Sequence, residues 1–130
     1  PKAPQRVRDS IDILGAERIG HGLLIAQDDK TVEYVAAKGV ALEICPTSNV
    51  YTHAVNTIRE HPIRKLMEAG VQVTLNSDDP HIFGIDLTHE YDLLHKEMHF
   101  GEDDFLKLNQ TALKVSFIHH TEAQAAWQKN

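Results

Sequence analysis

The stretch VQVTLNSDDPHIFG, residues 71–84, leads from an alternating segment into two adjacent aspartates, Asp78 and Asp79. In residues 71–76 the odd positions are apolar and the even positions are polar, which predicts a strand with one apolar and one polar face. Neighbouring carboxylates repel each other unless each has its own partner, such as a metal ion or a hydrogen-bond donor on a ligand. We expect Pro80, directly behind the pair, to prevent a helix at this point. The stretch therefore predicts a strand that ends at a ligand site.

The same succession of elements occurs three times along the chain: an amphipathic helix, a glycine, an apolar strand and a polar loop. The helices are predicted at residues 5–14, 30–38 and from 61–62 to 70, each ending at a glycine. The strands are predicted around 18–19 and at 40–45 and 71–76, with polar segments 20–22, 46–49 and 77–79 after them. After Gly84 only helices are predicted, at about 87–99 and 103–117, before a polar tail that includes His119 and His120 and is expected at the surface. Strands that alternate with helices predict βαβ units and a parallel sheet.

The polar face of residues 71–76 helps to decide between two folds of this class. A central strand of a doubly wound sheet is usually apolar on both faces, whereas a polar face suits the interior of a (β/α)₈ barrel near its C-terminal mouth. A complete barrel has eight strands and typically about 250 residues, and only three strands are predicted here. We therefore interpret residues 1–130 as the closing portion of a TIM-type barrel, about the last three strands plus C-terminal helices.

Composition excludes several classes of function. The 130 residues, 42% of them hydrophobic, suit one soluble globular domain. A net charge of −6 without a basic stripe argues against nucleic acid as a partner. We expect no membrane span, because no apolar run approaches about 18 residues, and no signal peptide is predicted. Cys45 is the sole cysteine, which excludes an internal disulfide and favours a reducing cytoplasm.

The residues that follow the three predicted strands are the candidates for a site. His21 follows the first strand, Cys45 ends the second, and Asp78 and Asp79 follow the third. The carboxyl ends of parallel strands lie at one edge, where barrels and open sheets hold their ligands. Adjacent residues at a strand end point to opposite sides, so one aspartate can face a metal and the other a substrate. We interpret Cys45 as a small buried strand residue.

Ser48 and Asn49 leave two possibilities open. Their side chains could form a local turn, or they could line the mouth of the site together with Thr47 and Thr52.

Several segments, in this order and spacing, resemble the adenosine/adenine deaminase family of the amidohydrolase superfamily. They are RIGHG (18–22), LEICPTSN (42–49), HPIRKLMEAGV (61–71), NSDDP (76–80), GIDLTHEY (84–91) and LNQTALKVSF (108–117). The resemblance covers essentially the whole chain but only the last three of the eight barrel strands of the family.

The resemblance implies a (β/α)₈ barrel with one zinc ion and the hydrolytic deamination of adenosine to inosine and ammonia. Asp78 matches the aspartate zinc ligand of the family, and His21 matches the histidine that orients the attacking water without being a regular zinc ligand. Asp79 matches the carboxylate that hydrogen-bonds purine N7. The residue types suit the chemistry, since zinc lowers the pKa of its water to about 7 and an imidazole and a carboxylate can position that water.

The other zinc ligands of the family and its catalytic glutamate would lie before residue 1. One ligand of four does not hold catalytic zinc, so we expect the isolated chain to be inactive. We interpret residues 1–130 as one partial domain of a metal-dependent hydrolase, which is either completed by another chain or truncated.

Alternative functions remain open at this point. One is an adenine deaminase of the same family, although CPTSNVYTHAV (45–55) and the residues after NSDDP are closer to the nucleoside-acting bacterial branch. The others are a catalytically incomplete barrel kept for binding or assembly, and a receiver-like module whose acidic pair binds Mg²⁺.

Overall fold

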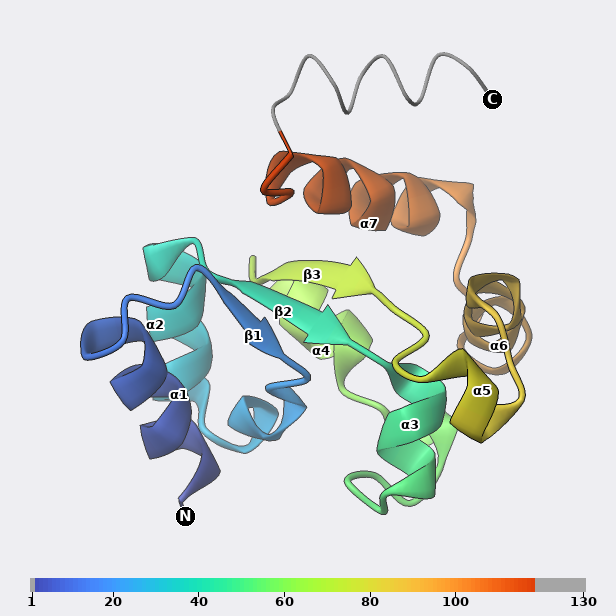
Figure 1. Cartoon of the computed structure of the whole chain (residues 1–130), viewed down its shortest axis with the longest axis horizontal. Coiled ribbons are helices and arrows are strands. Elements are labelled where there is room, and N and C mark those ends of the chain that lie inside the picture. The colour runs from blue at the N-terminus through green and yellow to red at the C-terminus, as the bar shows by residue number, and fades with distance from the viewer. Residues whose placement is uncertain (1, 119–130) are drawn as a thin grey trace.

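The computed structural model describes residues 2–118, which form an α/β fold around a three-stranded parallel sheet (Figure 1). The strands are β1 (Arg18–Gly20), β2 (Ala41–Ile44) and β3 (Gln72–Leu75). The helices are α1 (Ala3–Asp12), α2 (Asp29–Lys38), α3 (Pro46–Tyr51), α4 (Ile63–Glu68), α5 (Pro80–Phe83), α6 (Leu87–Met98) and α7 (Glu102–Lys114), with 3₁₀ helices η1 (Leu23–Gln27) and η2 (Ile58–Glu60). His119, His120 and the rest of the predicted tail lie outside the described residues.

The strands lie in the sheet in chain order, β1-β2-β3, and both pairs are parallel. Their arrowheads point toward the same edge, where α3 and α5 lie (Figure 1). In a doubly wound sheet the strand order reverses at a switch point, and ligands bind there. The described strands show no such reversal. Three parallel strands in chain order occur in a barrel and also in one half of a doubly wound sheet.

The sheet has an apolar face and a polar face, as the alternation in residues 71–76 predicts. Ile19, Leu42 and Val73 are aligned across the three strands and belong to the hydrophobic core or pack against it. On the polar face Arg18 Nε lies 3.3 Å from Glu43 Oε1 on the neighbouring strand.

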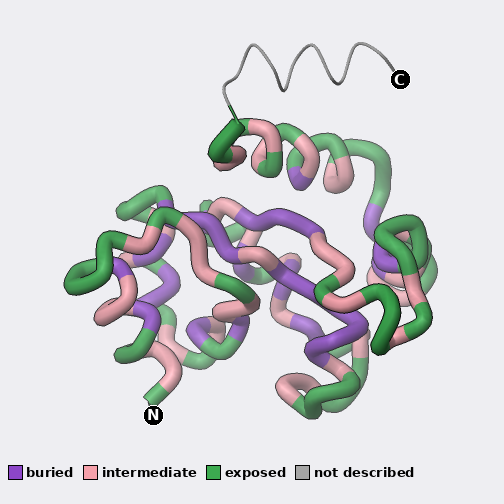
Figure 2. Tube along the Cα trace, viewed as in Figure 1, coloured by how far each residue is buried: buried purple, intermediate pink, exposed green. Residues whose placement is uncertain are grey.

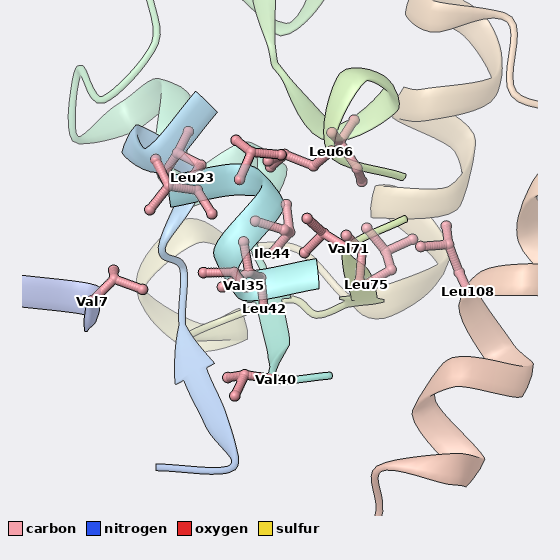
Figure 3. Close-up of a cluster of buried hydrophobic side chains, with 14 of the residues drawn as sticks. Val7, Leu23, Val35, Val40, Leu42, Ile44, Leu66, Val71, Leu75 and Leu108 are labelled. Carbon is pink, nitrogen blue, oxygen red and sulfur yellow. The ribbon is translucent and has the colours of Figure 1, made fainter. Parts of the chain in front are cut away.

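One continuous core joins the helices to the sheet. Buried segments run along the strands and along the inner sides of the helices (Figure 2). Figure 3 shows Val35 of α2, Leu66 of α4 and Leu108 of α7 gathered around Leu42 and Leu75 of the sheet. The three helices thereby hold β2 and β3 in place, and with them the strand ends that carry the candidate residues.

Two expectations for the strand ends are wrong, because both segments begin helices. Residues 46–49, predicted as a polar loop, form the first turn of α3, with Pro46 at its start. Pro80, predicted to prevent a helix, opens α5, which Asp79 caps and Gly84 ends. The physical reason is the same in both cases: proline breaks a helix interior, but at the first helical position its missing N–H and fixed φ favour a helix.

Within residues 2–118, none of the helices combines the length and the apolar character that crossing a membrane requires.

Candidate active site

The residues that follow β1, β2 and β3 converge at one edge of the sheet. His21, Cys45 and Asp78 each offer a metal-binding atom, and these atoms all lie within 4.8 Å of one another. His21 Nε2 is 3.6 Å from Asp78 Oδ2. The three side chains line a pocket of about 440 Å³, a volume within the range of about 300–1,000 Å³ that is usual for small-molecule sites.

The backbone adopts an uncommon conformation at both His21 and Asp78. Their φ angles are +56° and +59°, in the left-handed region that costs a non-glycine residue roughly 1–2 kcal/mol. Gly22 follows with φ +68°, and a Cβ atom there would lie 2.8 Å from Leu42 Cδ2. Gly22 therefore lets the chain turn closely over the core, which turns His21 out of β1 toward the pocket. Strain of this kind is frequent where a site dictates the backbone.

Asp79 does not line the pocket that contains His21 and Asp78. Its Oδ1 accepts hydrogen bonds from the backbone N–H groups of His81 and Ile82, both at 3.1 Å, and thereby caps α5. The two aspartates thus have different surroundings, as the strand-end geometry predicts. The contact between Asp79 and purine N7 stays a prediction.

Cys45 is buried, as predicted, but it is not a strand residue: it follows β2 and is the N-cap residue of α3. Burial, reinforced by the charges of Asp78, Glu90 and Glu43, raises the pKa of its thiol to about 12. Without a metal beside it, a thiol in this state is a poor nucleophile at neutral pH, since nucleophilic attack needs the thiolate.

The remaining donors fit a zinc ion in part. A carboxylate oxygen and an imidazole nitrogen are ligand types that zinc accepts, and Asp78 and His21 present them side by side. Structural and catalytic zinc sites take three or four protein ligands. Among residues 2–118, the group of His21, Cys45 and Asp78 is the one that could hold a metal ion, so a complete site needs ligands from elsewhere.

Asn49 takes a role that the sequence reasoning did not foresee. Its side chain is buried and contacts two histidines: Nδ2 lies 3.2 Å from His21 Nδ1, and Oδ1 lies 3.0 Å from His61 Nε2. Thr47 and Ser48 are also buried and do not line the pocket of His21 and Asp78. Asn49 therefore does not form the local turn that the sequence left open. Asn49 and Thr52 line a second pocket beside His21, as the other possibility predicts, whereas Thr47 and Ser48 line neither pocket.

His61 and Glu90 are further polar residues that the sequence reasoning missed. His61 is buried behind Asn49. Glu90 of α6 is fully buried, and both of its carboxylate oxygens accept from the Thr47 backbone N–H, at 3.3 and 3.2 Å. Burial raises the pKa of Glu90, against the hydrogen bonds from Thr47, which lower it. The only available signal was their position inside HPIRKLMEAGV and GIDLTHEY, two of the segments that carry the family resemblance.

Comparison with known proteins supports this resemblance. The family model described as Adenosine deaminase matches residues 2–129. An adenosine deaminase from Shewanella loihica is 42% identical over 118 residues, which are 91% of this chain and 36% of that protein. An aminodeoxyfutalosine deaminase from Streptomyces avermitilis is 44% identical over 115 residues, which are 88% of this chain and 32% of that protein. The chain thus spans about a third of the length of the curated relatives it matches.

A solved structure shows the same arrangement of elements. The crystal structure of an adenine deaminase from Arthrobacter aurescens superimposes with a TM-score of 0.89 at 28% identity. The match covers 98% of this chain and 41% of that one.

Proposed function

The chain belongs to the adenosine deaminase family, and on this premise we propose that it forms part of an enzyme that hydrolyses adenosine to inosine and ammonia. The observation that carries the proposal is the approach of His21 Nε2 to Asp78 Oδ2, 3.6 Å apart at the carboxyl ends of β1 and β3. These are the two residue types that the reaction needs beside the attacking water.

We place residues 1–130 at the end of a (β/α)₈ barrel, as its last three strands and C-terminal helices. Two observations support this placement: the chain spans about a third of its relatives, and the sheet has a polar face of the kind that lines a barrel interior. The first strands would come from a preceding segment, in the same polypeptide or in another chain.

Asp78 would hold the metal together with ligands from that preceding segment. When bound, a zinc ion supplies a water of lowered pKa, about 7, for attack at neutral pH. The exposed carboxylate of Asp78 lies at the pocket wall, where it is available to an ion.

His21 orients the attacking water toward purine C6 and stabilises the negative charge that develops on it. Its Nε2 lies 3.6 Å from Asp78 Oδ2, and both side chains line the same pocket. Asp79 would contact purine N7. Because N7 is an acceptor, this contact requires a proton on N7 or on the carboxyl group, and the proton makes the ring more electrophilic.

Adenosine is the substrate we favour, and the relatives supply two alternatives. The adenosine deaminase from Shewanella loihica supports the nucleoside. The similarly close aminodeoxyfutalosine deaminase supports that compound as a second candidate, and the structural neighbour supports free adenine.

The test is ammonia release by the complete barrel with adenosine, 2′-deoxyadenosine, adenine and aminodeoxyfutalosine. We expect the highest kcat/KM with adenosine. If kcat/KM is higher by about tenfold or more for adenine or aminodeoxyfutalosine, equivalent to about 1.4 kcal/mol, the proposal of adenosine as the substrate is wrong. The proposal of hydrolytic deamination would still hold. Absence of ammonia release from all four would overturn the proposed function.

A further inference from the structure

A line of three hydrogen bonds leads from the start of α4 through α3 to the ring of His21. The backbone N–H of Ile63 donates to His61 Nδ1 at 3.1 Å. His61 Nε2 lies 3.0 Å from Asn49 Oδ1, and Asn49 Nδ2 lies 3.2 Å from His21 Nδ1. His61 and Asn49 are 3% and 2% exposed, so water does not compete for these contacts.

The direction of every hydrogen bond in this line follows from its first donor. A backbone N–H can only donate, so His61 Nδ1 must be an acceptor. Burial lowers the pKa of His61 to about 4, and the ring is therefore neutral at neutral pH, with its single proton on Nε2. That proton is donated to the carbonyl oxygen of Asn49.

The side-chain amide of Asn49 determines which nitrogen of His21 accepts a hydrogen bond. Because its oxygen accepts from His61, its nitrogen faces His21, and an amide nitrogen only donates. His21 Nδ1 is thus an acceptor, and the proton of the neutral His21 ring lies on Nε2. This is the nitrogen that faces Asp78 at 3.6 Å.

We propose that Asn49 and His61 are positioning residues that hold neutral His21 in the tautomer with the proton on Nε2. The catalytic consequence rests on the proposed function. In this tautomer His21 offers an N–H to the attacking water. It stabilises negative charge on that oxygen and does not take a proton from it at Nε2. A partner that fixes the tautomer of a site histidine is a general device in enzymes.

A purely structural role for Asn49 is the competing explanation, and an isosteric variant separates the two. In Asn49→Asp the oxygen that faces His61 is kept, but the nitrogen that faces His21 becomes an oxygen. An oxygen in that place accepts, so His21 must carry a proton on Nδ1, either as the other neutral tautomer or as the imidazolium that the new carboxylate favours. A second pair tests His61: the side-chain amide nitrogen of His61→Gln can replace the Nε2 donor, whereas His61→Leu removes it.

The experiment is carried out on the completed barrel, labelled with ¹⁵N-histidine and free of metal and substrate. Long-range ¹H–¹⁵N correlations report which imidazole nitrogen carries the proton, and the His21 signals are identified by their loss in His21→Asn. We expect a proton on Nε2 in the unmodified protein and in His61→Gln, a proton on Nδ1 in Asn49→Asp, and both tautomers in His61→Leu.

Kinetics then test the consequence for catalysis. We expect kcat for adenosine to fall by about tenfold or more in Asn49→Asp and His61→Leu, the usual range for outer partners of a site. KM and kcat of His61→Gln should stay near those of the unmodified enzyme. A proton on Nδ1 of His21 in the unmodified protein would overturn the proposal, even if no variant folded. An unchanged tautomer in Asn49→Asp would do the same. If the tautomer shifts as expected while no variant releases ammonia from any substrate, the proposed function fails and the positioning role stands.

Discussion

His21 and Asp78 share a property with only two other non-glycine residues of the described chain, His53 and His99: a positive φ. Histidine and aspartate adopt this conformation more readily than most residues, and asparagine does so too. Substitution by alanine at either position therefore changes the backbone preference as well as the side chain. Asparagine keeps the preference and removes the functional group, so it is the matched control at both positions.

Substitutions of Asp78 and of His21 should affect zinc binding and turnover differently in the complete barrel. Asp78→Asn removes the negative charge of the proposed metal ligand, so zinc affinity and turnover should fall together. His21→Asn leaves the ligand in place, so zinc should stay bound while kcat falls by about 100-fold, as expected for a positioned acid–base or electrostatic group. Zinc content after dialysis and kcat for adenosine measure both effects. Normal metal content and near-normal rates in both variants would show that the site lies elsewhere.

Asp79 caps α5 by hydrogen bonds, and we also propose that it contacts the substrate. Two substitutions distinguish these two roles. Asparagine is as good a helix cap as aspartate, whereas alanine at an N-cap costs about 1 kcal/mol. We expect Asp79→Asn to retain the stability of the protein, because its Oδ1 can still accept from His81 and Ile82. Asp79→Ala should lose that stability.

Both variants should lose kcat/KM on adenosine and adenine alike, since N7 is common to the two. Urea unfolding and steady-state kinetics supply the two readouts. Full activity of Asp79→Asn would leave Asp79 with the capping role alone.

At the scale of elements, the short helices at the sheet edge depend on caps from their neighbours. Helix α3 has no side-chain cap from its own N-cap residue, Cys45. Glu90 of α6 supplies one instead, by accepting from Thr47 N–H. This bond ties α6 to α3, and α3 carries Asn49, which contacts His21. The packing of α6 against α3 therefore helps to position Asn49, and through Asn49 it helps to orient the side chain of His21.

The raised pKa of Glu90 predicts how this cap depends on pH. Because the folded state favours the protonated form, the contribution of Glu90 to stability is full below the pKa of an unfolded glutamate and is lost as pH rises through the folded value. Glu90→Gln resembles the protonated form and keeps an oxygen for Thr47 N–H. We expect it to match the unmodified chain at pH 4 and to be at least as stable at pH 7, by urea unfolding at both values.

Glu90→Leu is the control for the hydrogen bond itself. It leaves the buried N–H of Thr47 without an acceptor, which costs about 1–3 kcal/mol. A clear loss of stability in Glu90→Gln at pH 7 would contradict the expectation and would show that the ionised carboxylate stabilises the start of α3.

At the scale of the whole molecule, the sheet of residues 2–118 presents a polar face, and at its edge Asp78 has His21 and Cys45 as its neighbours in the one group there that could hold a metal ion. The apolar face is covered by α2, α4 and α7, as the core contacts show (Figure 3). The His21–Asp78 pocket is polar and open at the strand ends. This asymmetry fits the proposal that residues 1–130 are the closing segment of a barrel, in which the preceding strands would face it across the interior.

The isolated chain of residues 1–130 should therefore release no ammonia from adenosine and hold no stoichiometric zinc. Asp78 is the one residue of this chain that we propose as a regular zinc ligand, and a catalytic zinc ion takes three protein ligands. The measurement is zinc content after dialysis against a mild chelator, with the completed barrel as the control. One firmly held zinc ion per isolated chain would contradict the ligand count.

Much of this architecture follows from local pattern. The spacing of apolar residues predicts the order of helices and strands. The alternation in residues 71–76 likewise predicts the polar face of β3. Both patterns arise because the buried side of an element is apolar. The positions of His21, Cys45 and Asp78 after parallel strands predict that they meet at one edge. The short helices α3 and α5 were missed because proline at a first helical position resembles proline in a loop.

What only the tertiary structure decided is which distant polar groups become partners. Asn49 contacts His21 and His61, which are 28 and 12 positions away, and Glu90 reaches Thr47 across 43 positions. The buried state of these groups, and hence the lowered pKa of His61 and the raised pKa of Glu90, arises from helices packed around them. Local periodicity determines which face of an element is buried, but a buried polar group pairs with whichever donor or acceptor the packing brings to it.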